Sequence, residues 1–382
     1  MKMRFFIAAL FGLRAAGAVR FVAELGETAS VEEVLGEQYA AMVADGGVGA
    51  ITLGNSFRAI YGEFPQQLLE DFYRSGQIVA MSMDRQLEVA EYMVQQHAPN
   101  HLARLSQKSS LRGGNDSENG AYIYHSNAGN GVDVYLLDTG IDGTHPAFEG
   151  RVQKVADFSS DPVATGDPHG HGTAVAGVIG SSVFGVAKKC NLFDVRVANT
   201  AGHASLIGVL RALEHASKLA DVTKRPSLIA IPLEMPRNTI LNSAVEAVVR
   251  DLSIPVVVAA GNENRSACSV SPAGAYGALT IGSIDVARND ALAPFTNFAE
   301  CVDLFTAGVD VATVGLDHSS EHHLSGTSIS AGVASGLVAY YMSIGHYGMD
   351  AVSKIKLLSL PNVIPNLQQR SPETRNAILQ NL

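Results

Sequence analysis

Tryptophan is absent from this 382-residue chain and only three cysteines occur, so the sequence is not that of a disulfide-rich scaffold. The net charge is −10 and lysine and arginine form no clustered run, which argues against a nucleic-acid partner. Beyond the N-terminus no apolar run approaches about 18 residues, so we expect no membrane span after signal removal. What is present is a globular composition, with 47% apolar residues and 37 glycines.

The N-terminus has the pattern of a secretory signal. The basic start MKMR is followed by the apolar run Phe5–Leu13 and by small residues at Ala16–Ala18. We expect a signal peptide over residues 1–18, although Arg14 interrupts the pattern and a buried N-terminal segment is the alternative. A secretory route to the vacuole, cell wall or exterior would give meaning to two glycosylation sequons, at Asn115 and Asn264.

The next segment predicts a small α+β unit of its own. Apolar residues alternate or recur with helical spacing in the order βαββαβ. The expected strands are 19–24, 48–53, 57–61 and 77–83, and the expected helices are 31–43 and 65–72. Residues 85–130 are less periodic and are interpreted as a connection and an irregular start to the main domain.

From Val132 onward, strands alternate with helices, which predicts a mostly parallel sheet covered by helices. The expected strands are 132–137, 191–197, 228–233, 254–260 and 278–284, and the expected helices follow His171 and cover 204–219 and 239–252. Active sites of such sheets lie at the carboxyl ends of the strands.

Two motifs follow this rule and place an acid and a base at the sheet edge. Asp138 ends an apolar strand in VYLLDTGID. The same motif marks aspartic proteases, which need a second copy or a dimer, and the sequence has no second copy. The plain interpretation is an aspartate that caps a tight turn. His171 stands between glycines in DPHGHGTAVAGVIG, just before a small-residue helix, where it is a candidate general base. A zinc hydrolase that uses His169, His171 and His322 or His323 is a distant alternative.

Two further motifs supply a candidate nucleophile and an amide donor. Ser328 opens a long apolar helix in HLSGTSISAGVASGLVAYY, where free backbone amides stabilise a nearby oxyanion. Asn262 follows a strand in AAGNEN and offers a side-chain amide to the same oxyanion. A helix cap and a turn residue are the plain structural interpretations of the two positions.

The four groups together, in the order Asp, His, Asn, Ser, resemble the subtilisin family and, within it, the branch of proteinase K and fungal vacuolar proteinase B. The resemblance covers almost the whole chain. It implies a subtilisin-like catalytic domain over residues 93–382, a mostly parallel α/β sheet sandwiched by helices. It also implies an inhibitor-type propeptide over residues 19–92, removed near Tyr92 and Met93.

By this resemblance Ser328 is the nucleophile, His171 the general base, Asp138 its orienting carboxylate and Asn262 an oxyanion donor. The resemblance also pairs Cys268 with Cys301 and leaves Cys190 as a free, buried thiol. No cofactor is required. Asp303 matches a carboxylate that resembles a calcium ligand in some members of the family, and a single carboxylate is weak evidence for such an ion.

The chain departs from the family pattern in three places. Ala174 replaces a histidine that is not the base, and Gly332 and Val333 replace proline and histidine in the helix after Ser328; we expect altered packing and intact chemistry. The third departure is the segment Pro232–Pro236, where the family has SLGGG.

The resemblance places this segment along the substrate cleft. The predicted substrate-binding residues are Leu233, Glu234, Met235 and Gly261. Bulky side chains in place of glycines should narrow or refill the primary pocket. We therefore expect a self-processing serine endopeptidase of restricted specificity, for small side chains or, if Glu234 points inward, for basic ones. Its partners would be a polypeptide substrate and its own propeptide. The competing hypothesis is a weak or inactive subtilisin-fold protein that acts in binding or in the cell wall.

Overall fold

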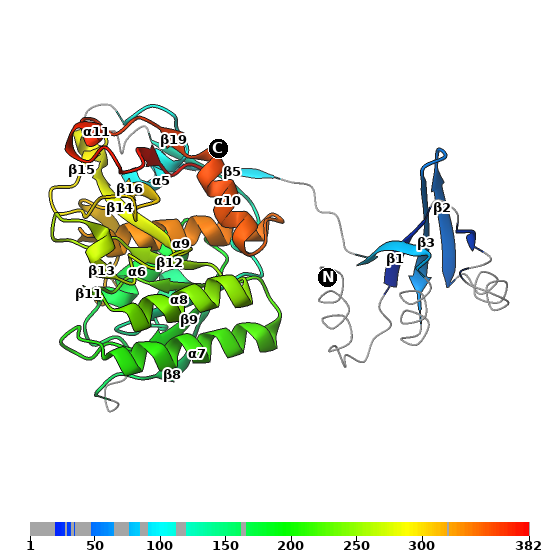
Figure 1. Ribbon diagram of the computed structural model, residues 1–382, viewed down its shortest axis with the longest axis horizontal. Helices are drawn as coiled ribbons and strands as arrows, with labels where there is room; N and C mark the ends of the chain where they lie inside the picture. The colour runs from blue at the N-terminus through cyan, green and yellow to red at the C-terminus, as the bar shows by residue number, and fades with distance from the viewer. Residues whose placement is uncertain are drawn as a thin grey trace. The chain divides into compact units, whose positions relative to one another are not determined.

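The structure is a computed structural model that describes residues 20–26, 29–31, 34, 47–64, 76–84, 91–111, 120–161, 166–318 and 321–381. Its contacts divide the chain into two units, Met1–Val89 and Ala90–Leu382, which are taken separately below (Figure 1). The predicted signal peptide, the sequon at Asn115 and most of the two helices predicted for the propeptide lie outside the described residues.

The first unit contains a four-stranded antiparallel sheet with the order β2-β3-β1-β4. The strands are β1 (Arg20–Leu25), β2 (Val48–Leu53), β3 (Phe57–Glu63) and β4 (Ile78–Met83). All four were predicted from apolar alternation. The alternation buries Phe21, Ala23 and Leu25 with Ile60 in a small core on one face of the sheet.

The second unit is built on a ten-stranded sheet with the order β19-β20-β16-β14-β12-β10-β7-β9-β8, in which β15 also pairs with β14. Neighbouring strands are parallel from β8 to β20. The strands are β7 (Asp133–Asp138), β8 (Val152–Asp157), β9 (Asn191–Arg196), β10 (Ser227–Ile231), β12 (Val256–Ala259), β14 (Leu279–Asp285), β15 (Ala291–Leu292), β16 (Leu304–Ala307), β19 (Leu360–Pro361) and β20 (Ala377–Ile378).

Helices cover both faces of this sheet, and the strand residues alternate between two cores. Val134 and Leu136 of β7 face the α6/α9 core, whereas Tyr135 and Leu137 face the α7/α8 core. The helices are α6 (His171–Gly180), α7 (Leu206–Thr223), α8 (Thr239–Leu252), α9 (Thr327–Ser343) and α10 (Met349–Leu358). Figure 1 shows α7 and α8 side by side along the sheet. The predicted α/β architecture is confirmed.

Short elements complete the second unit. They are β5 (Tyr92–Gln96), α5 (Asn100–Leu105), β6 (Ala121–His125), η3 (Pro146–Phe148), β11 (Met235–Pro236), η4 (Ala267–Ser269), β13 (Val270–Ser271), η5 (Val286–Arg288), β17 (Val311–Val314), β18 (Glu321–Leu324) and α11 (Leu367–Arg370). Among the described residues, none of the helices combines the length and apolarity that crossing a bilayer demands.

Two features of the sheet and its helices bear on the departures from the family pattern. The strand predicted over residues 228–233 ends at Ile231, because Pro232 has no amide hydrogen to continue the ladder. In α9, a Cβ atom at Gly332 would lie 2.7 Å from Val178 Cγ2 of α6. The glycine therefore lets the two buried helices pack closely.

Candidate active site

The fold brings Asp138 and His171 together at the carboxyl edge of the sheet. Asp138 is the last residue of β7 and its side chain is 1% exposed, and His171 is the first residue of α6. His171 Nδ1 lies 2.8 Å from Asp138 Oδ1 and 2.9 Å from Oδ2. The carboxylate thus fixes the ring with Nδ1 protonated, which leaves Nε2 to accept a proton.

Glycine allows this close approach of α6 to β7. A Cβ atom on Gly172 would collide with the carbonyl oxygen of Gly140 and would come within 3.1 Å of Asp138 Cβ. Gly140 itself has a φ of 118°, a conformation that favours glycine. Gly140 in the first motif and Gly172 in the second therefore both allow α6 to approach the end of β7 closely.

Asp167 joins the two motifs, a role that was not predicted from the sequence. Its Oδ1 accepts hydrogen bonds from Thr139 Oγ1 (2.7 Å) and from the Gly170 amide (2.9 Å). Its Oδ2 accepts from the amide (2.8 Å) and the hydroxyl (2.7 Å) of Thr173. The side chain is buried, so this one carboxylate ties the end of β7 to the first turn of α6.

The electrostatics of the site favour a charged imidazole. Burial lowers the pKa of His171, but the charge and hydrogen bond of Asp138 raise it more, and Asp167 adds to the rise. The net shift is upward from the usual 6.5. The site is therefore suited to hold the proton that a general base takes up.

Ser328 and Asn262 lie at the carboxyl edge as well. Ser328 is the second residue of α9, and Asn262 follows β12. Asn262 Oδ1 accepts hydrogen bonds from the Thr327 amide (2.8 Å) and hydroxyl (3.1 Å). Its carbonyl end is thereby held against the start of α9, and its amide end faces the other way.

The Ser328 hydroxyl is hydrogen-bonded away from the histidine. Its Oγ donates to the Pro232 carbonyl oxygen at 2.9 Å, and within the described residues no hydrogen bond joins it to His171. Catalytic hydrogen bonds are often absent in substrate-free enzymes and form with the substrate. In this conformation Asp138 is therefore hydrogen-bonded to His171, whereas the Ser328 hydroxyl is bonded to Pro232 and not to His171.

The segment Pro232–Pro236 meets Ser328 through the Pro232 carbonyl, and its side chains alternate in direction. Leu233 and Met235 pack against the α7/α8 core, and Met235 pairs with Ser271 in the β11–β13 ladder. Glu234 takes the opposite direction. Its Oε2 lies 2.5 Å from the position that a Cβ atom on Gly261 would occupy, next to Asn262.

A second carboxyl group meets Glu234 there. Burial and the adjacent Glu263 carboxyl raise the pKa of Glu234 to about 7, against the opposing effect of hydrogen bonds from Asn262. Glu263 Oε2 accepts from Asn297 Nδ2 at 3.0 Å and lies 3.6 Å from Arg265 Nε. Burial raises the pKa of Glu263, yet Glu234, Asn297 and Arg265 lower it more. Below about pH 7, Glu234 therefore holds the proton that the two carboxyls share, and Glu263 is the ionised partner.

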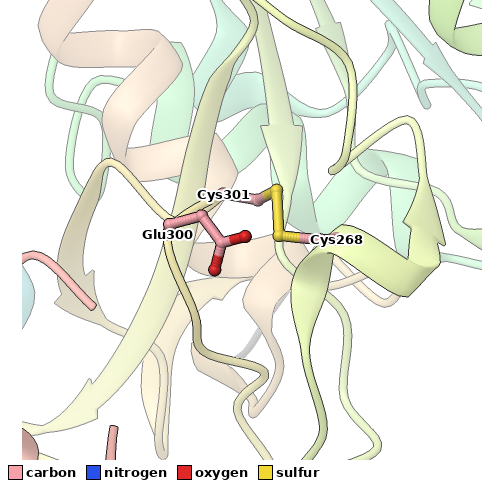
Figure 2. Close-up of side chains that lie close together, drawn as sticks. All are labelled: Cys268, Glu300 and Cys301. Carbon is pink, nitrogen blue, oxygen red and sulfur yellow. A yellow bond between two sulfur atoms is a disulfide. The ribbon is translucent and has the colours of Figure 1, made fainter. Parts of the chain in front are cut away.

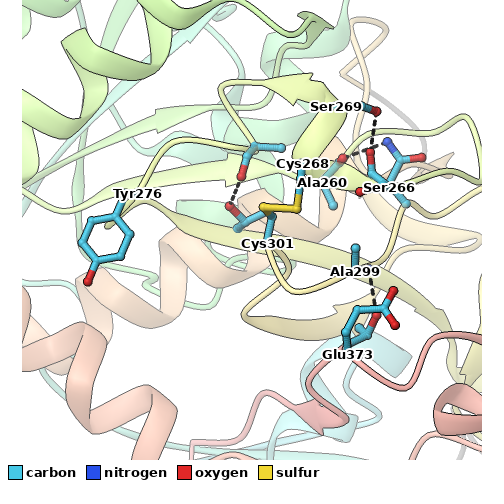
Figure 3. The surroundings of a disulfide bond; sticks show 12 residues. Ala260, Ser266, Cys268, Ser269, Tyr276, Ala299, Cys301 and Glu373 are labelled. Atoms are coloured by element: carbon cyan, nitrogen blue, oxygen red, sulfur yellow. Dashed lines mark hydrogen bonds between the residues drawn. A yellow bond between two sulfur atoms is a disulfide. The ribbon is translucent and has the colours of Figure 1, made fainter.

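The disulfide implied by the resemblance is present. Cys268 and Cys301 are joined, with Cα atoms 5.4 Å apart, and Cys190 is a free buried thiol. Figure 3 shows the bridge beside the short η4 turn, where Ser269 Oγ donates to the Ser266 carbonyl at 2.7 Å. The bridge therefore links the segment after Asn262 to the segment before β16.

The described residues offer little to a metal ion. The one group of three potential ligands in them is Cys268, Glu300 and Cys301 (Figure 2). Its two sulfurs are bonded to each other, so they are not thiolates and do not fit a metal. His169, His171 and His322 line one cleft but form no such group, so the zinc alternative is unsupported.

Asp303 also has protein partners in place of an ion. Its Oδ1 lies 2.5 Å from Lys356 Nζ, and its Oδ2 accepts from the Thr280 amide at 3.1 Å. Calcium needs six to eight oxygen ligands, and a lysine ammonium repels it. The calcium ligand predicted at Asp303 does not fit these contacts.

Comparison with known proteins agrees with this arrangement. Residues 129–360 match the model of the subtilase family. The chain is 34% identical over 302 residues to the subtilisin-like serine protease Pen ch 18 of Penicillium rubens, covering 76% of this chain and 60% of that protein. It is 34% identical over 292 residues to the subtilisin-like serine protease Rho m 2.0101 of Rhodotorula mucilaginosa, covering 74% and 82%.

The fold comparison agrees as well. A crystal structure of a cold-adapted subtilisin-like serine proteinase superposes with a TM-score of 0.67 at 29% identity, covering 75% of this chain and 99% of that one. The chain spans about 60% of the length of several of its curated relatives. The family match covers the strands and helices that carry Asp138, His171, Asn262 and Ser328. The chain belongs to the subtilase family.

Proposed function

We propose that this chain is a serine endopeptidase. The observation that carries the proposal is the buried Asp138–His171 pair at the sheet edge, where α9 also begins with Ser328. In the proposed reaction Ser328 Oγ attacks the peptide carbonyl, and His171 Nε2 takes its proton and gives it to the leaving amine. Water then hydrolyses the acyl-enzyme by the same base.

The oxyanion of each tetrahedral intermediate would be held by the Asn262 side-chain amide and the Ser328 backbone amide. The fixed carbonyl end of Asn262 supports this role, because it aims the amide end away from Thr327, although one amide hydrogen of Asn262 is donated to Glu234 when no substrate is bound. The Ser328 hydroxyl must leave the Pro232 carbonyl before it can attack. Rotation about the Cα–Cβ bond of Ser328 would release this hydrogen bond.

The direct test is labelling with a fluorophosphonate, which reacts with activated serine hydroxyls. We expect the wild-type chain to be labelled at Ser328, with no label on Ser328→Ala or His171→Ala. A wild-type chain that resists the probe and cleaves no peptide would instead support the competing role in binding or in the cell wall. Ser217, a buried serine in α7, provides the matched control variant Ser217→Ala, which should be labelled like the wild type.

The chain would be made as a precursor with residues 19–92 as its inhibitory propeptide. The first unit supports this proposal because it has its own core and an apolar outer face. Ile51, Leu53 and Tyr61 on that face are 40%, 62% and 38% exposed, which is typical of an interaction surface. Expressed in full, the wild type should shorten near residue 92, whereas Ser328→Ala should keep its full length.

Restricted specificity is the third element of the proposal. Glu234 and Met235 stand where the family has glycines, and Glu234 reaches toward Gly261. A large apolar substrate side chain would meet the Glu234 carboxyl. A peptide library should therefore yield a narrow profile, and a broad preference for large apolar residues before the scissile bond would contradict it.

A secretory route fits the Cys268–Cys301 bridge, since disulfides persist in oxidising compartments. The sequon residue Asn264 is exposed in the loop after β12. We expect the mature protein from cells to lose mass on treatment with an endoglycosidase, with Asn264→Gln as the control. Sequencing of the mature N-terminus would check residues 18 and 92 as processing sites.

A further inference from the structure

Glu234 is the one charged side chain that the Pro232–Pro236 segment directs toward the reacting groups. Its neighbours Leu233 and Met235 pack against the α7/α8 core. Because side chains alternate along an extended backbone, Glu234 points away from that core. The residue lies two positions from the Pro232 carbonyl that holds Ser328 Oγ. Its Oε2 comes against Gly261, the residue before Asn262.

Glu263 approaches the same place from the loop after β12 and has partners of its own. Asn297 Nδ2 donates to Glu263 Oε2 at 3.0 Å, and Asn297 Oδ1 accepts from the Glu263 amide at 3.2 Å. Arg265 Nε lies 3.6 Å from Glu263 Oε2. Glu263 is thereby held by Asn297 and Arg265. Glu234 is exposed, and its hydrogen bonds with Glu263 and Asn262 are the ones that a substrate cation would replace.

We propose that Glu234, backed by Glu263, selects a lysine or arginine side chain at the residue before the scissile bond. This inference rests on the proposed endopeptidase function and narrows its substrate class. In a bound substrate, the residue before the scissile bond carries the reacting carbonyl. Its side chain is therefore the one that lies near the oxyanion donor Asn262 and reaches the Glu234 carboxyl beside it. Glu234 is therefore a specificity-determining residue, and it is not a member of the triad.

Charge balance favours a cation over other side chains. Without substrate and with Glu234 protonated, the side chains of Glu234, Glu263 and Arg265 have a net charge of zero. When a substrate lysine displaces the proton of Glu234, the net charge of the three side chains and the lysine ammonium is again zero. An apolar side chain would bury the two carboxyls without supplying a charge to balance them, and an acidic one would add a further negative charge.

The same balance makes the selection depend on pH. The groups that surround the Glu234 carboxyl and change its pKa are Glu263 and Asn262, with Arg265 acting on Glu263 from outside. Because the pKa of Glu234 is raised to about 7, a rise in pH through this value removes the proton that competes with lysine. The preference for lysine should thus grow between pH 6 and 8.

The test compares two peptides that differ only in lysine or norleucine before the scissile bond. The measured quantity is the ratio of their kcat/KM values, in which the titration of His171 cancels because both substrates use the same base. We expect a ratio well above one that rises with pH. Glu234→Gln should lower the ratio about tenfold and flatten its pH dependence, the size expected for a partly exposed ion pair.

Two further variants assign the effect. In Glu263→Gln the lysine preference should persist and reach its plateau at a lower pH, because the group that helps hold the proton on Glu234 is gone. Glu214→Gln, on the exposed surface of α7, removes the same charge far from the segment and should leave the ratio unchanged.

The outcomes separate this inference from the proposed function. If fluorophosphonate labels Ser328 and peptides are cleaved, but Glu234→Gln leaves the ratio unchanged, the selection by Glu234 is overturned and the endopeptidase stands. A loss of the ratio in Glu263→Gln alone would move the role to Glu263. If no variant or wild-type chain is labelled, the proposed function itself fails.

Discussion

On the base side of the cleft, Asp138 bonds His171 and Asp167 bonds Thr139 and Thr173, which joins β7 to α6, and Asp138 and His171 stand in motifs that resemble the family's. On the pocket side, Pro232 and Glu234 stand where the family has other residues, and they contact Ser328 and Gly261. The proposed chemistry and the proposed substrate choice therefore depend on separate segments. One can change while the other is kept.

The largest effect should follow a change on the base side that leaves its shape intact. Asp138→Asn keeps the size of the side chain but favours the wrong tautomer of His171, because an amide can donate to Nδ1. We expect kcat/KM to fall about 10⁴-fold, as in serine proteases with this substitution. The rate should be measured per intact protein on the best library peptide. Asp142→Asn, in the following loop, is the control, and a loss below tenfold would contradict the role of Asp138.

The contrast between the two sides also explains what the sequence can predict. Asp138 ends an apolar strand and His171 begins a small-residue helix, so the alternation of strands and helices places both at the carboxyl edge of the sheet. The helix over 239–252 was predicted at its observed bounds because its apolar residues recur with helical spacing. By contrast, β16 and β17 have four residues each and were not predicted, since such short runs carry no clear period.

Side-chain partners far apart in the sequence were beyond prediction. The meeting of Glu234 with Glu263 depends on how the loops after β10 and β12 close over the sheet edge. Asp167 has five donors, and its neighbours in DPHGHG gave only a turn signal. The hydrogen bond of Ser328 to Pro232 likewise follows from the position of α9 and not from either motif.

The second prediction tests whether the base side is held by Asp167. Asp167→Ala would leave buried donors from Thr139 and Thr173 without an acceptor, so the free energy of unfolding should fall by about 3 kcal/mol. Denaturant unfolding measures this change. Ser160→Ala, in the exposed part of the same loop, is the matched control. An unchanged midpoint would show that the tie between β7 and α6 lies elsewhere.

A smaller effect concerns the acid limb of the activity profile. The base must be neutral to accept a proton, and the pKa of His171 is raised above 6.5. Activity on an uncharged peptide should therefore rise with pH through a midpoint above 6.5. Asp167→Asn removes one of the charges that raise this pKa and should move the midpoint down. Glu234→Gln, on the pocket side, should leave the midpoint for this uncharged peptide where it is.

The smallest effect is expected from removal of divalent ions. Because Lys356 already supplies the positive charge beside Asp303, no ion is needed there to balance the carboxylate. A bound ion stabilises the folded state in proportion to the logarithm of its concentration over Kd, so a chelator would lower Tm by several degrees if calcium were resident. We expect Tm to stay the same with and without chelator.

Lys356→Met should lower the unfolding free energy by about 1 kcal/mol, the upper range for a partly exposed pair. If the chelator lowers the Tm of the wild type and of Lys356→Met equally, a calcium site lies elsewhere in the chain. The stability that such an ion provides would then depend neither on the base side nor on the pocket side of the cleft.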